Sequence, residues 1–374
     1  MRVLNIITGL NTGGAENMLL RLSGGLASSG VRSSVVSLLQ PGPLAPHIEA
    51  LGVPVHSLGM RRGVPSPAAL VRLVRIIRRE KPDAVLSWLY HADLMAAVAT
   101  RLAGGVPLAW NLRCSYMDFS QYRRTTAWTV RLCALLSRLP EAVISNSTEA
   151  IRFHETLGYR PRRTEVIPNG FDTDRFRPDP DARRRLRASV GAGKDDIVVG
   201  LAGRYDAMKD HATFMSAAGV ALKRNPALRF VLCGDGVTTD NTELLGLIDR
   251  AGVGERTHLF GRVEDMPGFI AGLDMLVLSS KGEAFSNVLS EALCCEVPCV
   301  STDVGESRAI IGESGLLCPP ENPEALAESL LSMAAMPSGT RRDMGQRGRE
   351  RMVRDYALPS ITDRYVRFFQ SLRK

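Results

Sequence analysis

Two glutamates, Glu283 and Glu291, lie eight residues apart in the stretch GEAFSNVLSEAL, directly after the apolar run MLVLSS. Paired carboxylates could act as general acid and base, or could bind the hydroxyl groups of a polar ligand. Ser286 can cap a helix that begins at Asn287, which would place Glu283 at a loop tip and Glu291 in the second helical turn. The two side chains would then not share one helical face, so ligand binding is favoured. Two solvated surface acids are the alternative.

The expected helix also offers backbone groups to a ligand. The N–H groups of a first helical turn have no acceptor within the helix and lie at its positive end, so they can bind phosphate oxygens. In this stretch they belong to Asn287, Val288 and Leu289. One segment could therefore bind a sugar hydroxyl through Glu283, phosphate oxygens through the helix start and a ribose hydroxyl through Glu291.

A second group of charged residues lies in the sequence GLAGRYDAMKD, at the end of the apolar run IVVGLAG. Gly203 leads into a loop from which Arg204 and Lys209 would project. A guanidinium fork and a compact ammonium charge suit a diphosphate, above all one that departs during a reaction and gains negative charge. Two solvated surface cations are the alternative, but the position after a strand end favours the diphosphate.

The turn TGLNTGGAE follows the first apolar run of the chain. Gly13 and Gly14 allow the backbone to approach a ligand closely, and the helix expected after them offers N–H groups. The spacing differs from the dinucleotide pattern G-x-G-x-x-G and from the P-loop pattern G-x-x-x-x-G-K-[ST], so neither site is predicted. A phosphate-compatible turn and a merely tight turn both remain open.

The elements that must position these loops alternate between apolar runs and helix-length segments. This alternation is typical of βαβ units in a parallel sheet, where ligands bind beyond the carboxyl ends of the strands. The alternation restarts after a Pro-, Asp- and Arg-rich stretch at 168–186, which predicts two doubly wound domains, 1–168 and 169–356. The amphipathic pattern of 357–374 predicts a last helix that packs on a domain surface. The predicted strands are 3–7, 33–39, 53–58, 84–89, 107–112, 142–147 and 165–169, then 197–203, 229–236, 257–263, 275–280, 298–303 and 315–319.

The composition fits an ordinary two-domain globular protein. The 374 residues are 45% hydrophobic and 23% charged, which is enough apolar material to bury a large core. No stretch reaches the ~20 apolar residues of a membrane span, and the N-terminus begins like a strand without a small-residue cleavage site, so no signal peptide is predicted. Seven cysteines, none in a C-x-x-C pair, lie mostly in apolar runs. They favour buried thiols and a reducing cytoplasm.

Positive charge is concentrated in the first half of the chain. Residues 1–168 contain 20 Lys and Arg against 10 Asp and Glu, whereas the remainder contains 27 against 29, so the halves carry +10 and −2. Nucleic acid is not a predicted partner, because the basic residues are not interleaved with aromatic ones and no nucleic-acid motif is present. Two basic amphipathic segments, 67–81 and 123–139, either cover the sheet as ordinary helices or dock on an anionic membrane surface.

Together these motifs resemble those of the group 1 nucleotide-sugar glycosyltransferases, glycosyltransferase family 4, which are retaining enzymes. The matching features are GG at 13–14, GR-x4-K at 203–209, IPNGFD at 167–172, and E-x7-E at 283–291 within GEAFSNVLSEALCCEVPCVSTDVGE; they cover essentially the whole chain. The resemblance implies the GT-B fold, an α/β architecture of two Rossmann-like domains that face each other across a cleft. It also implies a donor-binding C-terminal domain, an acceptor-binding N-terminal domain, and a last helix that crosses back to the N-terminal domain.

The resemblance implies catalytic roles for four residues. Arg204 and Lys209 would bind the donor diphosphate, Glu283 would hydrogen-bond the 3- or 4-hydroxyl of the donor sugar, and His91 would touch the same sugar. A buried histidine at a strand end is the alternative for His91. Ala284 and Ser286 stand in place of the glycines of the Gly-Phe-Gly common in this family, which leaves the donor sugar open.

Further residues would bind the donor or the acceptor by the same resemblance. Gly14 would give the diphosphate a backbone N–H group, Glu291 would bind the ribose hydroxyls, and the base would lie near 261–263. The other donor-binding residues would be Gly203, Gly261, Arg262, Val263, Asn287, Val288 and Leu289, and those on the acceptor side Asn11, Thr12 and Gly13.

No metal and no other cofactor is predicted. The histidines have no ligand spacing, and the D-x-D triplets at 172–174 and 179–181 fall in the linker, where capping and turns explain them. The expected reaction is transfer of a hexose or N-acetylhexosamine from a nucleotide sugar, with a UDP-sugar favoured, to a saccharide or lipid-linked hydroxyl in surface-polysaccharide or glycolipid synthesis. A nucleotide-sugar epimerase or hydrolase and a non-catalytic assembly subunit are the alternatives, and the oligomeric state is left open.

Overall fold

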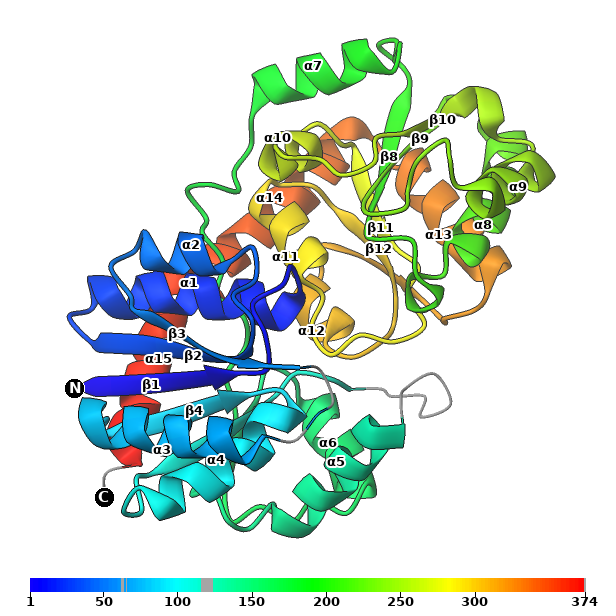
Figure 1. Cartoon of the computed structure of the whole chain (residues 1–374). Helices are drawn as coiled ribbons and strands as arrows, with labels where there is room; N and C mark the ends of the chain where they lie inside the picture. The colour runs from blue at the N-terminus through cyan, green and yellow to red at the C-terminus, as the bar shows by residue number, and fades with distance from the viewer. Residues whose placement is uncertain (62–63, 65, 116–123, 373–374) are drawn as a thin grey trace. The chain divides into compact units, whose positions relative to one another are not determined.

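A computed structural model describes residues 1–61, 64, 66–115 and 124–372 (Figure 1). The chain forms two compact units. The N-terminal unit comprises Met1–Gly170 and Leu358–Lys374, and the C-terminal unit comprises Phe171–Ala357. The sequence analysis placed these boundaries at 168/169 and 356/357.

A seven-stranded parallel sheet is the centre of the N-terminal unit, in the order β3-β2-β1-β4-β5-β6-β7. Strands β1, β4, β5 and β6 are buried along almost their whole length, which explains why they are continuous apolar runs in the sequence. The strands are β1 (Arg2–Ile7), β2 (Arg32–Leu39), β3 (Val55–Met60), β4 (Ala84–Trp88), β5 (Leu108–Leu112), β6 (Ala142–Ser145) and β7 (Thr164–Val166).

Helices cover both faces of this sheet. One core packs α1, α2 and α15 on the sheet, and the apolar stripe of the last helix, including Tyr365 and Phe369, is buried in it. A second core packs α3, α4, α5 and α6 on the opposite face. The helices are α1 (Gly14–Ser28), α2 (Ala45–Glu49), α3 (Pro67–Glu80), α4 (Tyr90–Leu102), α5 (Arg124–Leu136), α6 (Thr148–Thr156) and α15 (Leu358–Ser371).

A six-stranded parallel sheet, in the order β10-β9-β8-β11-β12-β13, is the centre of the C-terminal unit. Its strands are β8 (Ile197–Ala202), β9 (Leu228–Cys233), β10 (Thr257–Leu259), β11 (Met275–Leu278), β12 (Cys299–Thr302) and β13 (Gly315–Cys318). Its helices are α7 (Pro180–Ser189), η1 (Ala207–Lys209), α8 (His211–Arg224), α9 (Thr242–Ala251), η2 (Gly254–Arg256), α10 (Met266–Ala271), α11 (Asn287–Cys294), α12 (Ser307–Ile311), α13 (Pro323–Ala335) and α14 (Ser338–Asp355).

Strand order reverses once in each sheet. The chain runs outward from β1 to β3 and then returns to place β4 on the other side of β1; β11 likewise lies beside β8. Ligands in such sheets bind at the carboxyl ends of the two strands that flank this switch point. The expected sites therefore follow β1 and β4 in one unit and β8 and β11 in the other.

Each run predicted as a strand contains a strand, so the α/β expectation is confirmed. The predicted runs are too long where a glycine turns the chain. The run 229–236 ends as a strand at Cys233, because Gly234 has a φ of +144°, and 257–263 ends at Leu259, two residues before Gly261 with a φ of +61°.

The described residues contain no helix that is both long and apolar enough to span a membrane. All seven cysteines are unbonded thiols, and six of them are buried.

Candidate functional site

Lys209 and Glu283 form an ion pair in the C-terminal unit, although 74 residues separate them in the sequence. Lys209 ends η1, which follows β8, and Glu283 follows β11, so the switch point of the sheet brings the two side chains together. The Lys209 ammonium donates to Oε1 of Glu283, which also accepts a hydrogen bond from the Ser280 hydroxyl at 3.1 Å.

Glu283 lies in the loop between β11 and α11, and this loop packs its side chain down. Its side chain is 17% exposed. The loop is held down because Phe285 stacks on Phe171 at 6.1 Å between ring centroids and is itself buried. Gly305 lies directly beneath, since a Cβ at this residue would come within 1.8 Å of the Glu283 carbonyl oxygen.

The backbone around Lys209 is tied to the strand that leads to Glu283. The Ser279 hydroxyl donates to the Lys209 carbonyl at 2.8 Å, and the Lys281 N–H donates to the Met208 carbonyl at 2.9 Å. Gly203 lies along the Lys209 side chain, where a Cβ would be 3.4 Å from the lysine Cδ. The ammonium is thus positioned by backbone contacts and not only by its carboxylate partner.

His211 lies two residues after this lysine and is buried. Burial, followed by the positive charge of Lys209, lowers the pKa of His211 to about 4. Its ring is therefore neutral at neutral pH, and Lys209 supplies the positive charge at this position.

Arg204 and Arg262 are exposed and paired with acids on nearby loops. Nε of Arg204 is 3.0 Å from Asp206, and Arg262 donates two hydrogen bonds, of 2.7 and 2.8 Å, to Asp235. These hydrogen bonds lower the pKa of Asp235. Because exposed ion pairs contribute little, about 0–1 kcal/mol, both guanidinium groups can exchange their partners for an anionic ligand at small cost.

Helix α11 begins at Asn287, as predicted, but Ser286 does not cap it through its side chain. Its first turn, which holds Val288 and Leu289, directs N–H groups toward the loop of Glu283, as helix geometry requires. Glu291, in the second turn, is only 9% exposed. Glu283 and Glu291 therefore belong to different parts of the segment, as the sequence indicated.

The predicted residues of the N-terminal unit gather at its own switch point. Gly13 is the N-cap of α1 and Gly14 its first residue, after β1, and the preceding Asn11 and Thr12 are exposed. His91 lies in the first turn of α4, after β4, because β4 ends at Trp88 and Leu89 turns the chain with a φ of +72°.

Comparison with known proteins identifies the family. A sequence model described as "Glycosyltransferase Family 4" matches residues 12–175, and one described as "Glycosyl transferases group 1" matches residues 196–335. The chain is 28% identical to the glycosyltransferase EpsF of Bacillus subtilis over 81% of its length and 79% of the relative's. It is 26% identical to the lipopolysaccharide core biosynthesis glycosyltransferase LpsE of Rhizobium meliloti over 96% of both chains.

The solved structures agree on the fold. The crystal structure of Anabaena HepE in complex with UDP superposes with a TM-score of 0.86 at 22% identity, covering 99% of this chain and 100% of the other. The chain is a group 1 glycosyltransferase of the GT-B fold. The resemblance stated from its sequence motifs is therefore confirmed, as is its assignment to the transferases.

The glycosyltransferase has site residues that sequence reasoning missed. Asp235, the partner of Arg262, lies in the G-D-G turn 234–236, where both glycines have positive φ. This Gly-Asp-Gly turn, directly after β9, is a sequence signal from which Asp235 could have been predicted. Gly305, beneath Glu283, has a φ of +53° and follows β12 in the sequence STDVGE. Ser280 could not have been singled out, because its contact with Glu283 depends on the loop's conformation.

The D-x-D triplets of the glycosyltransferase have structural roles. The Asp172 carboxylate accepts hydrogen bonds from the N–H groups of Asp174 and Arg175, and the Asp179 carboxylate caps α7. Val263, predicted near the base, packs against the hydrophobic core, while Gly261 forms the turn beside Gly234. A search of the described residues found no cluster of three or more His, Cys, Asp or Glu side chains suited to a metal ion.

Proposed function

We propose that the protein is a retaining glycosyltransferase that moves a hexose or N-acetylhexosamine from a UDP-sugar to a hydroxyl group of a saccharide or lipid-linked acceptor. The acceptor would belong to surface-polysaccharide or glycolipid synthesis, because the relative LpsE is named a lipopolysaccharide core biosynthesis glycosyltransferase. The observation that carries the proposal is the Lys209–Glu283 pair at the switch point of the C-terminal sheet.

The pair suits a nucleotide sugar because its two members bind opposite ends of the reacting bond. Lys209 would neutralise the diphosphate as its bond to C1 of the sugar breaks, together with Arg204 and the first turn of α11. Glu283 would accept hydrogen bonds from the sugar hydroxyls. In the absence of donor each charge is satisfied by the other, and the diphosphate would replace Glu283 as the partner of Lys209.

The proposed reaction keeps the configuration at C1. The bond from C1 to the diphosphate oxygen breaks, the acceptor hydroxyl oxygen bonds to C1 on the same face, and its proton passes to the departing phosphate. No protein nucleophile is needed for these steps. The assignments of Gly14 to the diphosphate, His91 to the donor sugar and Glu291 to the ribose remain predictions from the family resemblance.

Calorimetry with UDP-glucose, UDP-galactose, UDP-N-acetylglucosamine, GDP-mannose and ADP-glucose tests the donor assignment. We expect at least one UDP-sugar to bind and the GDP- and ADP-sugars to bind at least tenfold more weakly. A preference for GDP- or ADP-sugars would contradict the choice of UDP. Rapid donor turnover without acceptor would instead favour the hydrolase or epimerase, and absence of any nucleotide binding would favour a non-catalytic subunit.

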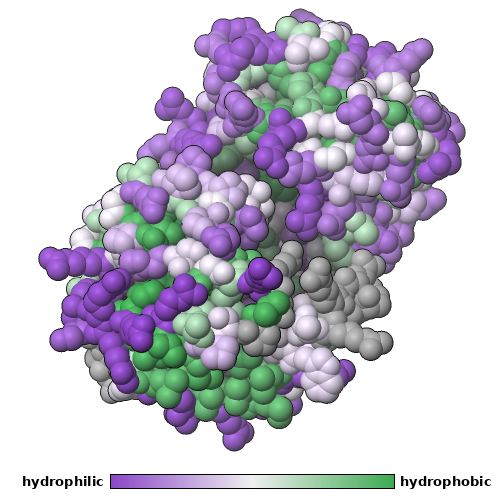
Figure 2. Space-filling model, viewed as in Figure 1, coloured by the Kyte–Doolittle hydropathy of each residue, from purple (hydrophilic) through white to green (hydrophobic). Residues whose placement is uncertain are grey.

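We also propose that one surface of the N-terminal unit docks on an anionic membrane. Five of the ten exposed large hydrophobic side chains among the described residues lie on α4 and α5, which pack side by side. They form the α4–α5 apolar surface: Val98, Leu102, Trp128, Leu132 and Leu135. Figure 2 shows apolar side chains gathered on this unit. By contrast, α3 buries Leu73, Val74 and Ile77 and exposes Val71, so the segment 67–81 offers less apolar surface to a membrane.

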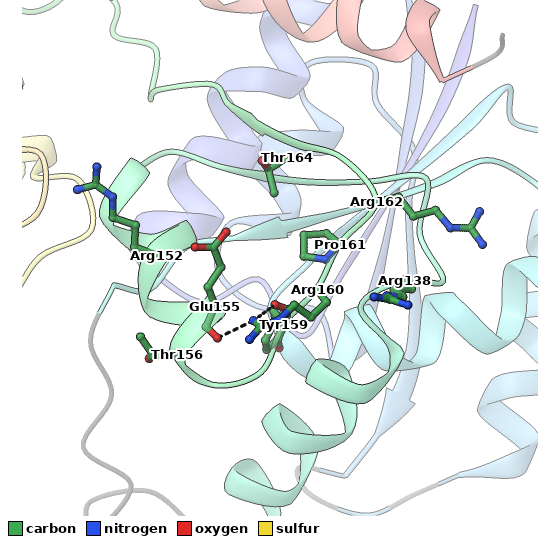
Figure 3. Close-up of a pocket in the computed structure, with 9 residues that line it drawn as sticks. All are labelled: Arg138, Arg152, Glu155, Thr156, Tyr159, Arg160, Pro161, Arg162 and Thr164. Carbon is green, nitrogen blue, oxygen red and sulfur yellow. Dashed lines mark hydrogen bonds between the residues drawn. The ribbon is translucent and has the colours of Figure 1, made fainter.

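Arginines border this surface. The guanidinium of Arg131 lies 5.5 Å from the Trp128 ring, and Arg138 follows α5 at the edge of an open cavity of about 1050 Å³. The cavity is also lined by Arg152, Arg160 and Arg162, and Figure 3 shows Arg152 and Arg162 pointing outward on opposite sides. Because 160–162 precede β7, the cavity lies at the amino ends of the strands, away from the switch point.

The double substitution Trp128→Ser and Leu135→Ser tests the membrane proposal. Inserting one such side chain contributes about 1.5–3 kcal/mol, so we expect binding to phosphatidylglycerol vesicles to fall at least tenfold. Co-sedimentation measures it, and transfer to a water-soluble acceptor should be unchanged. Val353→Ser, at an exposed apolar position on α14 outside this surface, is the control. Vesicle binding unaffected by the double substitution would rule out this surface.

A further inference from the structure

Two buried polar side chains at the end of β5 have no hydrogen-bond partner among the described residues. Asn111 is 1% exposed, and both atoms of its amide group are buried and unpaired. Arg113 follows two residues later, and both of its terminal guanidinium nitrogens are likewise buried and unpaired. Burying such groups without partners costs several kcal/mol. Folding alone does not account for them.

The surroundings hold the guanidinium in place. It lies over the ring of Trp88, 5.0 Å from the centroid, and Trp88 is the register partner of Asn111 on the neighbouring strand β4. Tyr365 of α15 is fully buried nearby, and its hydroxyl interacts with Asn111 and Arg113. Burial lowers the pKa of Arg113, and Tyr365 and Glu16 oppose this shift. The guanidinium therefore has a neutral neighbour in Tyr365, but no carboxylate among the described residues hydrogen-bonds its terminal nitrogens.

Glu16 supplies a negative charge close to Arg113. It lies in the first turn of α1, and its carboxylate folds over the helix start, since a Cβ on Gly13 would be 2.4 Å from Glu16 Oε2. Burial raises the pKa of Glu16, whereas its own backbone N–H and Arg113 lower it. A carboxylate thus already lies near the α1 N-terminus and Arg113, without hydrogen-bonding the terminal guanidinium nitrogens.

We propose that Asn111 and Arg113, at the end of β5, form a subsite for an anionic group of the acceptor, a phosphate or a carboxylate. This inference rests on the proposed function, because it assigns the subsite to the acceptor. A guanidinium fork matches both anions, and the Asn111 amide adds a neutral donor. In the absence of ligand, the Glu16 carboxylate occupies the position of the ligand anion. It moves away when the anion binds. The exposed Asn11 and Thr12 form the rim.

Titration with inorganic phosphate at constant ionic strength, followed by thermal shift and calorimetry, tests the subsite. We expect Arg113→Met to weaken phosphate binding at least tenfold, and Arg113→Lys, which keeps the charge but not the fork, to weaken it less. Glu16→Gln should strengthen binding severalfold, because it removes the competing charge. Lys209→Ala is the control for the donor site and should retain the Arg113-dependent phosphate binding.

A purely structural role for Arg113 predicts different results. Arg113→Met would then lower the melting temperature without phosphate, and phosphate binding would be the same in all variants. A ligand site predicts an unchanged or higher melting temperature, since the substitution removes an unpaired buried charge. Loss of phosphate binding in Lys209→Ala but not in Arg113→Met would also overturn the inference.

Acceptor-like probes show whether the subsite prefers phosphate or carboxylate, and they distinguish binding at this subsite from binding of the donor. Glucose 6-phosphate or glucuronate should bind in an Arg113-dependent manner, and whichever binds more tightly identifies the anion; equal binding of neutral glucose would overturn the inference. UDP-glucose binding should be the same in Arg113→Met and wild type. Arg113-dependent phosphate binding in a protein that binds no nucleotide sugar would contradict the proposed function and leave the anion subsite standing.

Discussion

Lys209→Ala is expected to reduce kcat/KM about a hundredfold while the fold is retained. Lys209 is the cation at the switch point that is tied to both flanking loops, so no neighbour can replace it at the departing diphosphate. Loss of one charged transition-state contact costs on the order of 3 kcal/mol. Steady-state transfer at saturating acceptor measures the effect, and circular dichroism checks the fold.

A nearby lysine provides the control for this substitution. Lys281 lies in the loop that leads to Glu283, but its ammonium contacts Glu321 at 2.8 Å. Lys281→Ala should therefore change kcat/KM less than threefold. Glu283→Ala should reduce kcat/KM about as much as Lys209→Ala does. The double variant should lose less transition-state free energy than the two single variants together, because the two residues act as one unit. Turnover of Lys209→Ala within threefold of wild type would refute the diphosphate assignment.

The fold was predictable because its strands are buried on both faces. Continuous apolar runs such as LAWNL in β5 and MLVLSS after α10 mark buried strands, and the repeat of the pattern after the linker indicates two sheets. The strand ends were less predictable, since they depend on single backbone angles. Leu89, a residue type that rarely has positive φ, ends β4 and moves His91 from a loop into a helix.

The candidate site was predictable as a set of loops but not as a set of contacts. The sequence indicates that Lys209 and Glu283 follow strands, but not that β8 and β11 are neighbours, and only that order pairs them. The same limit applies to helices. Segments 67–81 and 123–139 have similar patterns, and only packing shows that α3 exposes Val71 whereas α5 exposes Trp128 and Leu135.

Buried polar groups are a further limit of sequence reasoning. Asn111 and Arg113 lie in and after an apolar run, so their types alone do not show that their polar atoms lack partners. That property depends on Trp88 and Tyr365, which are distant in sequence and approach only in the folded sheet and helix.

Gly305→Ala is expected to abolish more than 99% of transfer activity, because it combines backbone strain with a clash beneath Glu283. At a φ of +53°, alanine costs about 1–2 kcal/mol. In addition, its Cβ would lie 1.8 Å from the Glu283 carbonyl oxygen and 2.8 Å from that of Ala284. The loop must then move, and the Glu283 carboxylate loses its position beside Lys209. Transfer kinetics and the melting temperature measure the two effects.

Gly252→Ala separates strain from the clash. Gly252 has a φ of +67°, and a Cβ there would meet nothing within 4 Å, so this variant carries the strain alone. It should lose about 1–2 kcal/mol of stability and keep its kcat/KM, since it ends α9, outside the loops of the site. If Gly305→Ala lost no more stability and no more activity than Gly252→Ala, the close approach of Gly305 would not position Glu283. The larger loss in Gly305→Ala therefore measures what this approach contributes to the site.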